Sequence, residues 1–301
     1  MNSLEVNTNS AKAWMLASRP KTLTGAAVPV CIALSLAYTE RGTLISVSAL
    51  LCLLFAFCMQ INANLINDYF DFTQGIDRED RLGPERACSQ GRIRQAAMKK
   101  GILVTILLSV LTGLPLILWG GWTMILVGMA CIVFSYLYTT LLSRRALGDV
   151  LVLLFFGIVP VCATYYLQTG QVTPVAFLLS LGCGFATDNL LIVNNFRDRD
   201  TDKRHGKTTL VTLLGERPSL LLYIALSFMA MLLACAAACL YAHCLPILPL
   251  CLSLAYFLAT FVVWQRMCTI RYGKALNQVL GQTSLTILMY GLMVSLSLLT
   301  L

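Results

Sequence analysis

Long apolar runs alternate with short polar links along almost the whole chain. A transmembrane helix needs ~20 consecutive, mostly apolar residues, and runs of about that length recur from residue 22 onward. The links contain turn-forming residues, such as "GG" at 120–121 and "QTGQVTP" at 168–174. The pattern predicts nine membrane-spanning helices, at 22–39, 44–66, 102–119, 121–141, 149–168, 173–195, 218–241, 245–264 and 279–300.

Composition supports an all-α, polytopic membrane protein, and we expect its nine helices to surround a central cavity that opens to the cytoplasmic side. The 301 residues are 58% hydrophobic and only 12% charged, about half the charged fraction of soluble domains. Because the apolar runs extend over the whole length, we expect one domain over 1–301, with a flexible polar tail at 1–12. The 12 cysteines include no C-x-x-C pair, which favours small buried thiols over a metal site. No nucleic-acid partner is expected.

The basic residues are distributed very unevenly between the two ends of the predicted spans. Of the 22 Lys and Arg residues, Arg41 alone lies in a link on the opposite face from the rest. The others lie in the N-terminal segment, 67–101, 142–148, 196–217 and 265–278. Cytoplasmic loops carry the excess of Lys and Arg, so the sequence predicts a cytoplasmic N-terminus and, with nine spans, an external C-terminus. Most of the +8 net charge therefore reflects topology.

Two acidic stretches leave spans on this same basic face. They read "NLINDYFDFTQGID" at 64–77 and "NNFRDRDTDKRHGKTTL" at 194–210. At 3.6 residues per turn, Asn64, either Asn67 or Asp68, and Asp71 share one helical face. In the second stretch, Asn194, Asp198 and Asp202 follow at i, i+4 steps. Ordinary solvated charge would explain one such column, but two matched columns indicate a site.

The chemistry of these columns favours a bound cation and a polyphosphate. Like charges at i, i+4 destabilise a helix unless something neutralises them. Hard oxygen ligands suit Mg²⁺, which takes one or two carboxylates and completes its shell with water and substrate phosphates. Nearby cations would bind the remaining phosphate oxygens. The candidates for that role are Lys21, Arg197, Lys203 and Lys207.

These residues resemble the intramembrane aromatic prenyltransferases of the UbiA type. The first motif, N-D-x-x-D, is Asn67, Asp68 and Asp71, and the second, D-x-x-x-D, is Asp198 and Asp202. Further stretches resemble the menaquinone-pathway branch, which prenylates 1,4-dihydroxy-2-naphthoate. They are "RPKT" at 19–22, "GPERACSQGRI" at 83–93, "LGD" at 147–149 and "FFG" at 155–157. Branches that use 4-hydroxybenzoate usually have Asp where this chain has Gly75, and here the extra acid is Asp77.

The resemblance implies transfer of a polyprenyl group from polyprenyl diphosphate to dihydroxynaphthoate, with release of diphosphate and CO₂ to give demethylmenaquinol in menaquinone biosynthesis. It implies a multi-pass enzyme of a bacterial cytoplasmic (inner) membrane that requires Mg²⁺. Its catalytic residues would be Asp68, Asp71, Asp198 and Asp202, and Asn67 and Asn194 would join them at the metal. The diphosphate residues would include Asp77.

Acceptor-binding candidates are less specific, and each has a structural alternative. Asp188 lies within the sixth predicted span, where a charge by default marks function but can also pair across helices. Tyr138 lies near the acceptor by resemblance, or is an interfacial anchor. Arg145, in a linker shorter than the family pattern, is an acceptor ligand or a topology charge. Asn64 completes this group of candidates, and His205 is interpreted as a solvated loop residue.

Two other functional classes remain open from the sequence. The first is a related enzyme with another aromatic acceptor, such as 4-hydroxybenzoate or homogentisate. The second is a transporter, since polar groups in spans also mark ion paths. Charge clusters confined to one face argue against a transporter, which places its site near the membrane midplane.

Overall fold

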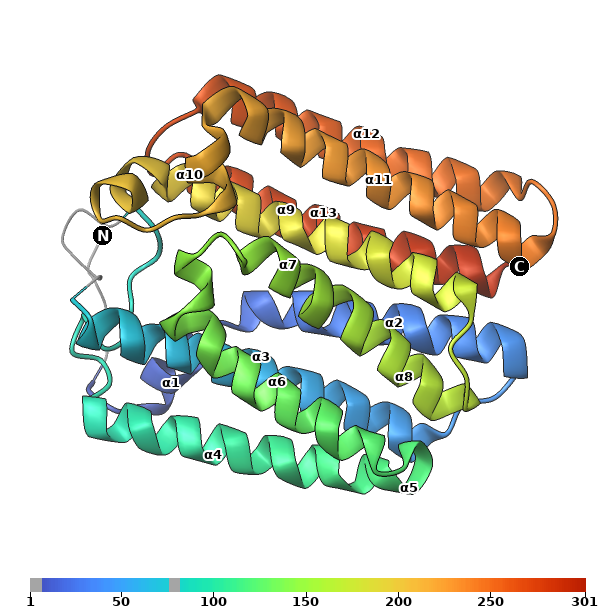
Figure 1. Cartoon of the computed structure of the whole chain (residues 1–301), viewed down its shortest axis with the longest axis horizontal. Coiled ribbons are helices and arrows are strands. Elements are labelled where there is room, and N and C mark those ends of the chain that lie inside the picture. The colour runs from blue at the N-terminus through green and yellow to red at the C-terminus, as the bar shows by residue number, and fades with distance from the viewer. Residues whose placement is uncertain (1–6, 76–81) are drawn as a thin grey trace.

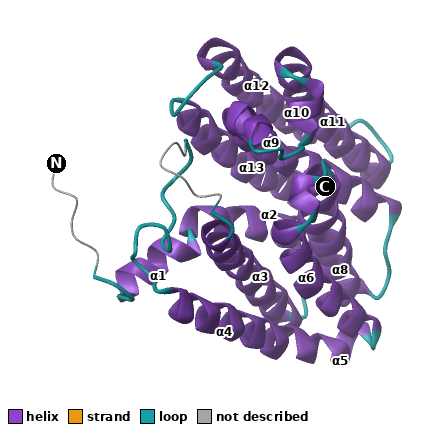
Figure 2. Ribbon diagram, turned by 60° about the vertical axis from the view of Figure 1, so that its left-hand side comes forward, coloured by secondary structure: helices purple, strands orange, loops and turns teal. Residues whose placement is uncertain are grey.

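The computed structural model describes residues 7–75 and 82–301. Over this part of the chain the regular structure is helical (Figure 2), apart from an isolated parallel bridge between Arg145 and Thr208. The predicted all-α class is confirmed. The helices are α1 Ala11–Ser18, α2 Pro20–Arg41, α3 Ser46–Thr73, α4 Gln95–Gly113, η1 Leu114–Leu116, α5 Ile117–Gly120, α6 Thr123–Thr140, η2 Leu142–Arg144, α7 Gly148–Leu153, η3 Leu154–Ile158, α8 Val159–Thr169, α9 Pro174–Arg204, α10 Leu210–Leu214, α11 Glu216–Ala242, α12 Ile247–Ile270 and α13 Leu276–Leu299.

Nine stretches among the described residues are long and apolar enough to cross a membrane, as the sequence predicts. Two of them combine consecutive helices: α4, η1 and α5 form the span Gln95–Gly120, and α7, η3 and α8 form Gly148–Thr169. Figure 1 shows the spans running along the long axis of the molecule, with α1 and the C-terminus at opposite ends. An odd number of crossings requires this arrangement.

Helices α3 and α9 continue well beyond the apolar runs that predicted them. Hydropathy predicts ends near residues 66 and 195, but the helices extend to Thr73 and Arg204. No Gly or Pro interrupts either extension. With 28 and 31 residues at 1.5 Å per residue, they are ~42 and ~46 Å long, whereas the hydrocarbon core is ~30 Å thick. Both acidic motifs therefore lie on helical extensions.

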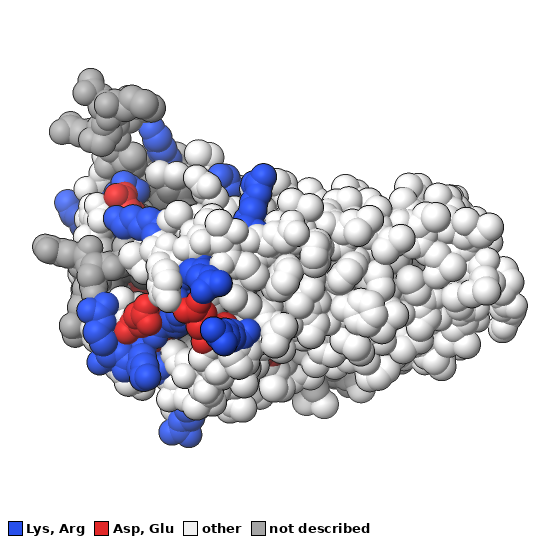
Figure 3. Space-filling view, turned by 90° about the horizontal axis from the view of Figure 1, so that it is seen from above, with Lys and Arg blue, Asp and Glu red and all other residues white. Residues whose placement is uncertain are grey.

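Charged side chains gather at one end of the molecule. In Figure 3 the Lys, Arg, Asp and Glu residues visible on that face cluster at one end, and the remainder of the surface is uncharged. At the opposite end, Arg41 Nη2 donates to the Thr169 carbonyl. The Tyr165 hydroxyl donates there to Glu40. This separation matches the predicted charge asymmetry, and the side of the membrane that each end faces stays a prediction.

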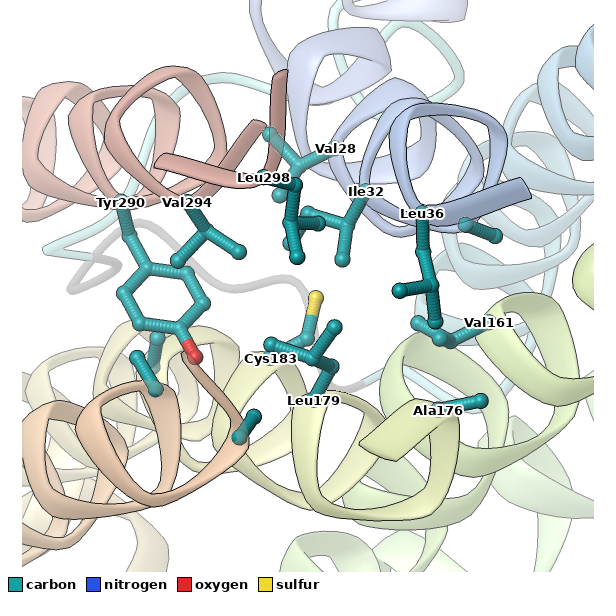
Figure 4. Close-up of a cluster of buried hydrophobic side chains, with 14 of the residues drawn as sticks. Val28, Ile32, Leu36, Val161, Ala176, Leu179, Cys183, Tyr290, Val294 and Leu298 are labelled. Carbon is teal, nitrogen blue, oxygen red and sulfur yellow. The ribbon is translucent and has the colours of Figure 1, made fainter. Parts of the chain in front are cut away.

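The largest buried apolar cluster joins the two sides of the bundle (Figure 4). Ile32 of α2, Val161 of α8, Leu179 of α9 and Val294 of α13 meet in it. Close packing of small residues accompanies the cluster, as is typical of helices that associate in lipid. A Cβ built on Gly157, in the π-helical turn η3, would lie 2.5 Å from the Ser180 carbonyl oxygen and 2.8 Å from the Gly184 Cα.

The N-terminal segment makes hydrogen bonds to the segment before α4. The Asn9 amide donates to the Arg92 carbonyl at 2.8 Å, and Asn9 Oδ1 accepts from the Arg94 amide at 3.1 Å. Helix α1 then begins at Ala11. Backbone and side-chain hydrogen bonds thus join residues 8 and 9 to the segment before α4, and the flexible tail over 1–12 stays a prediction.

Candidate functional site

A cavity of about 1550 Å³ opens among α2, α3, α6, α9 and α13. One end of it is polar and contains Lys21, Asp71, Arg86, Asn194, Asp198 and Lys207. The other end is apolar and contains Val30, Cys52, Leu116, Met124 and Leu167. The cavity thus joins a group of charges to a long apolar space inside the bundle, an arrangement that suits an amphipathic substrate with an anionic head.

The first acidic motif presents Asn67 and Asp71 to this cavity, and Asn64 lies one turn before them. Thr139 Oγ1 of α6 donates a hydrogen bond to Asn67 Oδ1. Asp71 accepts from Arg86 Nη2 in a salt bridge. The sequence allows either Asn67 or Asp68 to share a helical face with Asn64 and Asp71. In the structure, Asn67 is the one that faces the cavity with them.

Asp68 points away from the cavity and is only 2% exposed. Its two carboxylate oxygens accept from the Ala87 and Cys88 amides, at 2.8 and 2.9 Å. A carboxylate that accepts backbone amides at a turn stabilises that turn, much as an N-cap does. Asp68 therefore anchors the segment 82–94 to α3, and its assignment as a metal ligand stays a prediction.

The second acidic motif is organised by Arg197, which is 4% exposed. Its guanidinium donates to Asp198 through Nε and Nη2, at 2.8 and 2.6 Å, and to Asn194 Oδ1 at 2.8 Å. Its Nη1 donates to Asn277 Oδ1 of α13 at 2.8 Å. The planar guanidinium, with its five donors, suits a bridging role of this kind.

The two motifs are brought together through the segment that follows the first of them. Asn277 Nδ2 donates to the Leu82 carbonyl at 2.8 Å. A Cβ built on Gly83 would lie 2.8 Å from Arg197 Nη2, so the backbone here passes directly over the guanidinium. The segment 82–94 thus contacts both motifs: its Ala87 and Cys88 amides bind Asp68, and its Gly83 backbone lies against Arg197.

Asp202 pairs with Lys207, whose Nζ lies 3.0 Å from Oδ2. The Lys207 amide also donates to the Asp202 carbonyl at 2.9 Å, which fixes the turn after α9. The linker after α6 lies against this turn, because the Ala146 amide donates to the Thr208 carbonyl at 2.9 Å.

The oxygen ligands that the sequence predicts for Mg²⁺ fit such an ion in chemical type. Asn67, Asp71, Asn194, Asp198 and Asp202 line one cavity with amide and carboxylate oxygens, the ligands that Mg²⁺ prefers. Within the described residues, no three His, Cys, Asp or Glu side chains converge on one point. The three motif carboxylates in the cavity, Asp71, Asp198 and Asp202, are instead each paired with a cation of the protein.

Several other predicted residues differ in their placement. Lys21 and Tyr138 line the cavity, whereas Lys203 and Arg145 are exposed and do not. Asp188 is buried in α9, 5% exposed, and is not among the cavity-lining residues. Asp77 lies outside the described residues.

Four residues of the site are absent from the sequence-based candidates. Arg86 and Asp149 fall within stretches that carry the family resemblance, "GPERACSQGRI" and "LGD", so a signal for them exists. Thr139 and Asn277 carry no such signal, since a polar residue at the end of a span is commonplace. Only the packing of α6 and α13 against the motifs reveals their role.

Comparison with known proteins points to one family. The model of the UbiA prenyltransferase family matches residues 26–280. The 1,4-dihydroxy-2-naphthoate octaprenyltransferase of Escherichia coli is 35% identical over 70% of this chain and 71% of its own length. The enzyme of the same name from Haemophilus influenzae is 31% identical over 88% of this chain and 83% of its own.

Solved structures show the same fold. A UbiA homologue from Archaeoglobus fulgidus bound to GPP and Mg²⁺ superimposes with a TM-score of 0.66, over 96% of this chain and 100% of that one, at 14% identity. A UbiA homologue from Aeropyrum pernix gives a TM-score of 0.69 over 90% of this chain and 96% of that one. At this level of identity the likeness extends to the fold alone.

Proposed function

The chain belongs to the UbiA prenyltransferase family, and from this premise we propose that it transfers a polyprenyl group from polyprenyl diphosphate to 1,4-dihydroxy-2-naphthoate. The observation that carries the proposal is the cavity, which has acidic and basic side chains at one end and apolar side chains along the rest. It matches a substrate with an anionic head and a long apolar tail. The acceptor follows from the relatives that share a third of their residues with this chain.

The polar end binds the diphosphate. Arg197, Lys207 and Lys21 line it and supply positive charge. Arg86 joins them, since its guanidinium already pairs with a carboxylate at the cavity surface. Charge-assisted hydrogen bonds from such groups to phosphate oxygens are the strong ones. Lys203 is exposed and would act from the rim, and Asp77, the remaining candidate from the sequence, lies outside the described residues.

Mg²⁺ is the expected cofactor, as in the solved homologue that was bound to GPP and Mg²⁺. Asp71, Asp198 and Asp202 would hold it, with Asn67 and Asn194 as neutral oxygen ligands. When bound, it would offset the negative charge that builds on the departing diphosphate. Asp68 supports this group by keeping the segment 82–94 in place.

The remaining steps use the cations and the shape of the cavity. As the allylic C–O bond breaks, the electron pair leaves with the diphosphate, whose growing charge Arg197 and Lys207 stabilise more than they stabilise the bound substrate. The apolar part of the cavity excludes water from the allylic cation. The electron-rich ring then forms the new C–C bond at the carbon that bears the carboxylate. Loss of CO₂ restores aromaticity without a strong base.

Further parts of the proposal concern the acceptor, the topology and the domain. Asn64 and Tyr138 line the cavity and are retained as acceptor contacts. Arg145 is exposed and would act only from the mouth. The chain forms one domain, and its charged end faces the cytoplasm of a bacterial inner membrane, where the excess of Lys and Arg is expected.

Mass spectrometry of the product tests this function. Purified protein, Mg²⁺ and a ladder of prenyl diphosphates are combined with dihydroxynaphthoate, 4-hydroxybenzoate or homogentisate in separate reactions. We expect prenylated product with the first acceptor alone. Asp198→Asn should abolish it, whereas Asp200→Asn, an exposed change on the same helix, should not. Product with 4-hydroxybenzoate and none with dihydroxynaphthoate would reassign the acceptor.

A further inference from the structure

Two acidic side chains inside the spans, Asp149 and Asp188, belong neither to the ion-paired carboxylates nor to the hydrogen-bonded residues Glu40 and Asp68 described above. Asp149 stands in the first turn of α7, and Asp188 lies in the middle of α9. These two helices pack against each other. The residue before Asp149 lies against this part of α9, because a Cβ built on Gly148 would lie 3.2 Å from Leu191 Cδ2. No Lys, Arg or His forms a salt bridge with either of them within the described residues.

Each group has one carboxyl oxygen without a hydrogen-bond partner in the described part of the protein: Oδ1 of Asp149 and Oδ1 of Asp188, which are both buried. Neighbouring polar groups are occupied elsewhere: Thr187 donates to the Cys183 carbonyl at 2.9 Å, and Asn189 donates to Ser227 at 2.8 Å. Burying an unsatisfied carboxyl group is costly. Their presence therefore calls for a ligand that satisfies them.

Asp149 and Asp188 lie farther from the charged end of the cavity than the diphosphate residues do. Asp149, Tyr138 and Thr187 line the cavity, and Asp188 directly follows Thr187. A Cβ built on Gly148 would lie 3.9 Å from the Tyr138 hydroxyl, so this hydroxyl rests against the backbone that precedes Asp149. Asp188 precedes Asn194 by six residues on one helix, a rise of ~9 Å toward the apolar end. The pair is thus beyond the diphosphate residues.

We propose that Asp149 and Tyr138, which line the cavity, form the subsite that recognises a hydroxyl group of the aromatic acceptor, with Asp188 as a positioning residue next to it in α9. The inference rests on the proposed function for the identity of that acceptor. A phenolic hydroxyl donates a hydrogen bond to a carboxyl oxygen, and the Tyr138 hydroxyl can donate to or accept from the same group. This satisfies the Asp149 oxygen that the empty protein leaves without a partner.

The charges also orient the ring. The acceptor carboxylate finds no cation paired with Asp149 or Asp188 among the described residues, and it is attracted to the cations around Arg197 and Lys207. The hydroxyl at ring position 4, which is para to the hydroxyl at position 1 and meta to the carbon that bears the carboxylate, therefore turns toward Asp149. The carbon that bears the carboxylate then faces the diphosphate end, where the allylic carbon lies.

Equilibrium binding tests the inference separately from turnover. Dissociation constants for 1,4-dihydroxy-2-naphthoate and for 1-hydroxy-2-naphthoate, which lacks the position-4 hydroxyl, are measured on the wild type, Asp149→Ala and Asp188→Ala. We expect the wild type to prefer the diol, and each variant to lose roughly ten- to a hundredfold in affinity for the diol. Affinity for 1-hydroxy-2-naphthoate should change little. Asp200→Ala is the matched control on the exposed face of α9.

Thermal unfolding without ligand separates recognition from a structural role. Removing a buried, unsatisfied carboxyl group should leave the protein as stable as the wild type or more stable, because the empty protein gains nothing from the group. Asp149→Asn and Asp188→Asn, which keep one acceptor oxygen, should recover part of the lost affinity. The Michaelis constant for prenyl diphosphate should stay unchanged in all four variants.

Three results would overturn the inference. The first is equal loss of affinity for both naphthoates, and the second is a lower unfolding temperature in every variant. The third is stabilisation of the wild type by Mg²⁺ or Ca²⁺ alone that disappears in these variants, which would make the pair a cation site. If the wild type binds the diol but never prenylates it, the proposed function is wrong. The binding constants of the variants still test the roles of Asp149 and Asp188 in recognising the hydroxyl group.

Discussion

Replacing Asp68 by Asn should release the segment 82–94 from α3. The carboxylate is 2% exposed and accepts two backbone amides, at 2.8 and 2.9 Å. Asn offers a single oxygen and turns its NH₂ group toward the other amide, which is then buried without a partner. A hydrogen bond to a charged group contributes about 1.5–3 kcal/mol, and an unsatisfied buried donor costs about 1–3 kcal/mol. We therefore expect local opening of the segment to become easier by about 3 kcal/mol.

Hydrogen exchange measures this opening directly. A change of about 3 kcal/mol corresponds to roughly a hundredfold faster exchange at the Ala87 and Cys88 amides. Exchange in the middle of α9 should not change. The matched control is Asp71→Asn, which removes the salt bridge to Arg86 but leaves both backbone hydrogen bonds intact. It should impair Mg²⁺ binding with little effect on exchange in the segment.

The reasoning would be refuted by unchanged exchange in Asp68→Asn together with a loss of Mg²⁺ affinity equal to that of Asp71→Asn. Asp68 would then be a metal ligand whose contacts to the segment contribute little. Loss of turnover alone does not distinguish the two roles, because both predict it.

Four further predictions concern other parts of the molecule. Gly157→Ala should destabilise the protein by several kcal/mol, because its Cβ would meet the α9 backbone at 2.5 Å, whereas Gly128→Ala, with no atom within 4 Å, should not; thermal unfolding measures both. Lys207→Met should raise the KM for prenyl diphosphate roughly tenfold and leave the KM for the aromatic acceptor unchanged, and the reverse pattern would move Lys207 to the acceptor. A cysteine at the exposed residue Thr73, in a cysteine-free background, should react with an impermeant thiol reagent only in opened cells; labelling in intact cells would reverse the topology. His205→Ala should keep most activity, with one labelled CO₂ released per prenyl transfer, and a product that retains its carboxylate would require a base.

The sequence predicts the membrane architecture well because hydropathy reports directly on burial in lipid. It fails at the ends of α3 and α9, where helices continue into water. The polar residues of "NDYFDFT" and "FRDRDTDKR" lower the hydropathy, so the predicted span ends before them. Neither stretch contains a Gly or Pro that would end the helix. The acidic motifs were therefore predicted at the correct positions but with too little helix to support them.

The sequence predicts several of the polar residues that line the cavity, but it does not predict the contacts that they make. Adjacent positions such as Asn67 and Asp68 point ~100° apart on a helix, and only the packing of the segment 82–94 decides which faces the cavity. The contacts of Arg197 with Asn277, and of Thr139 with Asn67, join helices far apart in sequence. A single sequence contains no information on such contacts unless a motif marks the residue.

The pairing of Asp71, Asp198 and Asp202 with cations of the protein has a thermodynamic consequence. A divalent ion arriving alone must displace Arg86, Arg197 or Lys207 from its carboxylate, and the displaced cation is left without a counter-ion. Diphosphate supplies the anionic oxygens that these cations then need. The carboxylates can therefore exchange their protein cations for the metal ion favourably only when diphosphate binds those cations at the same time. Metal and diphosphate should bind with positive cooperativity, and by linkage each must raise the affinity of the other by the same factor. A metal titration of the empty enzyme will accordingly underestimate the affinity that operates during turnover.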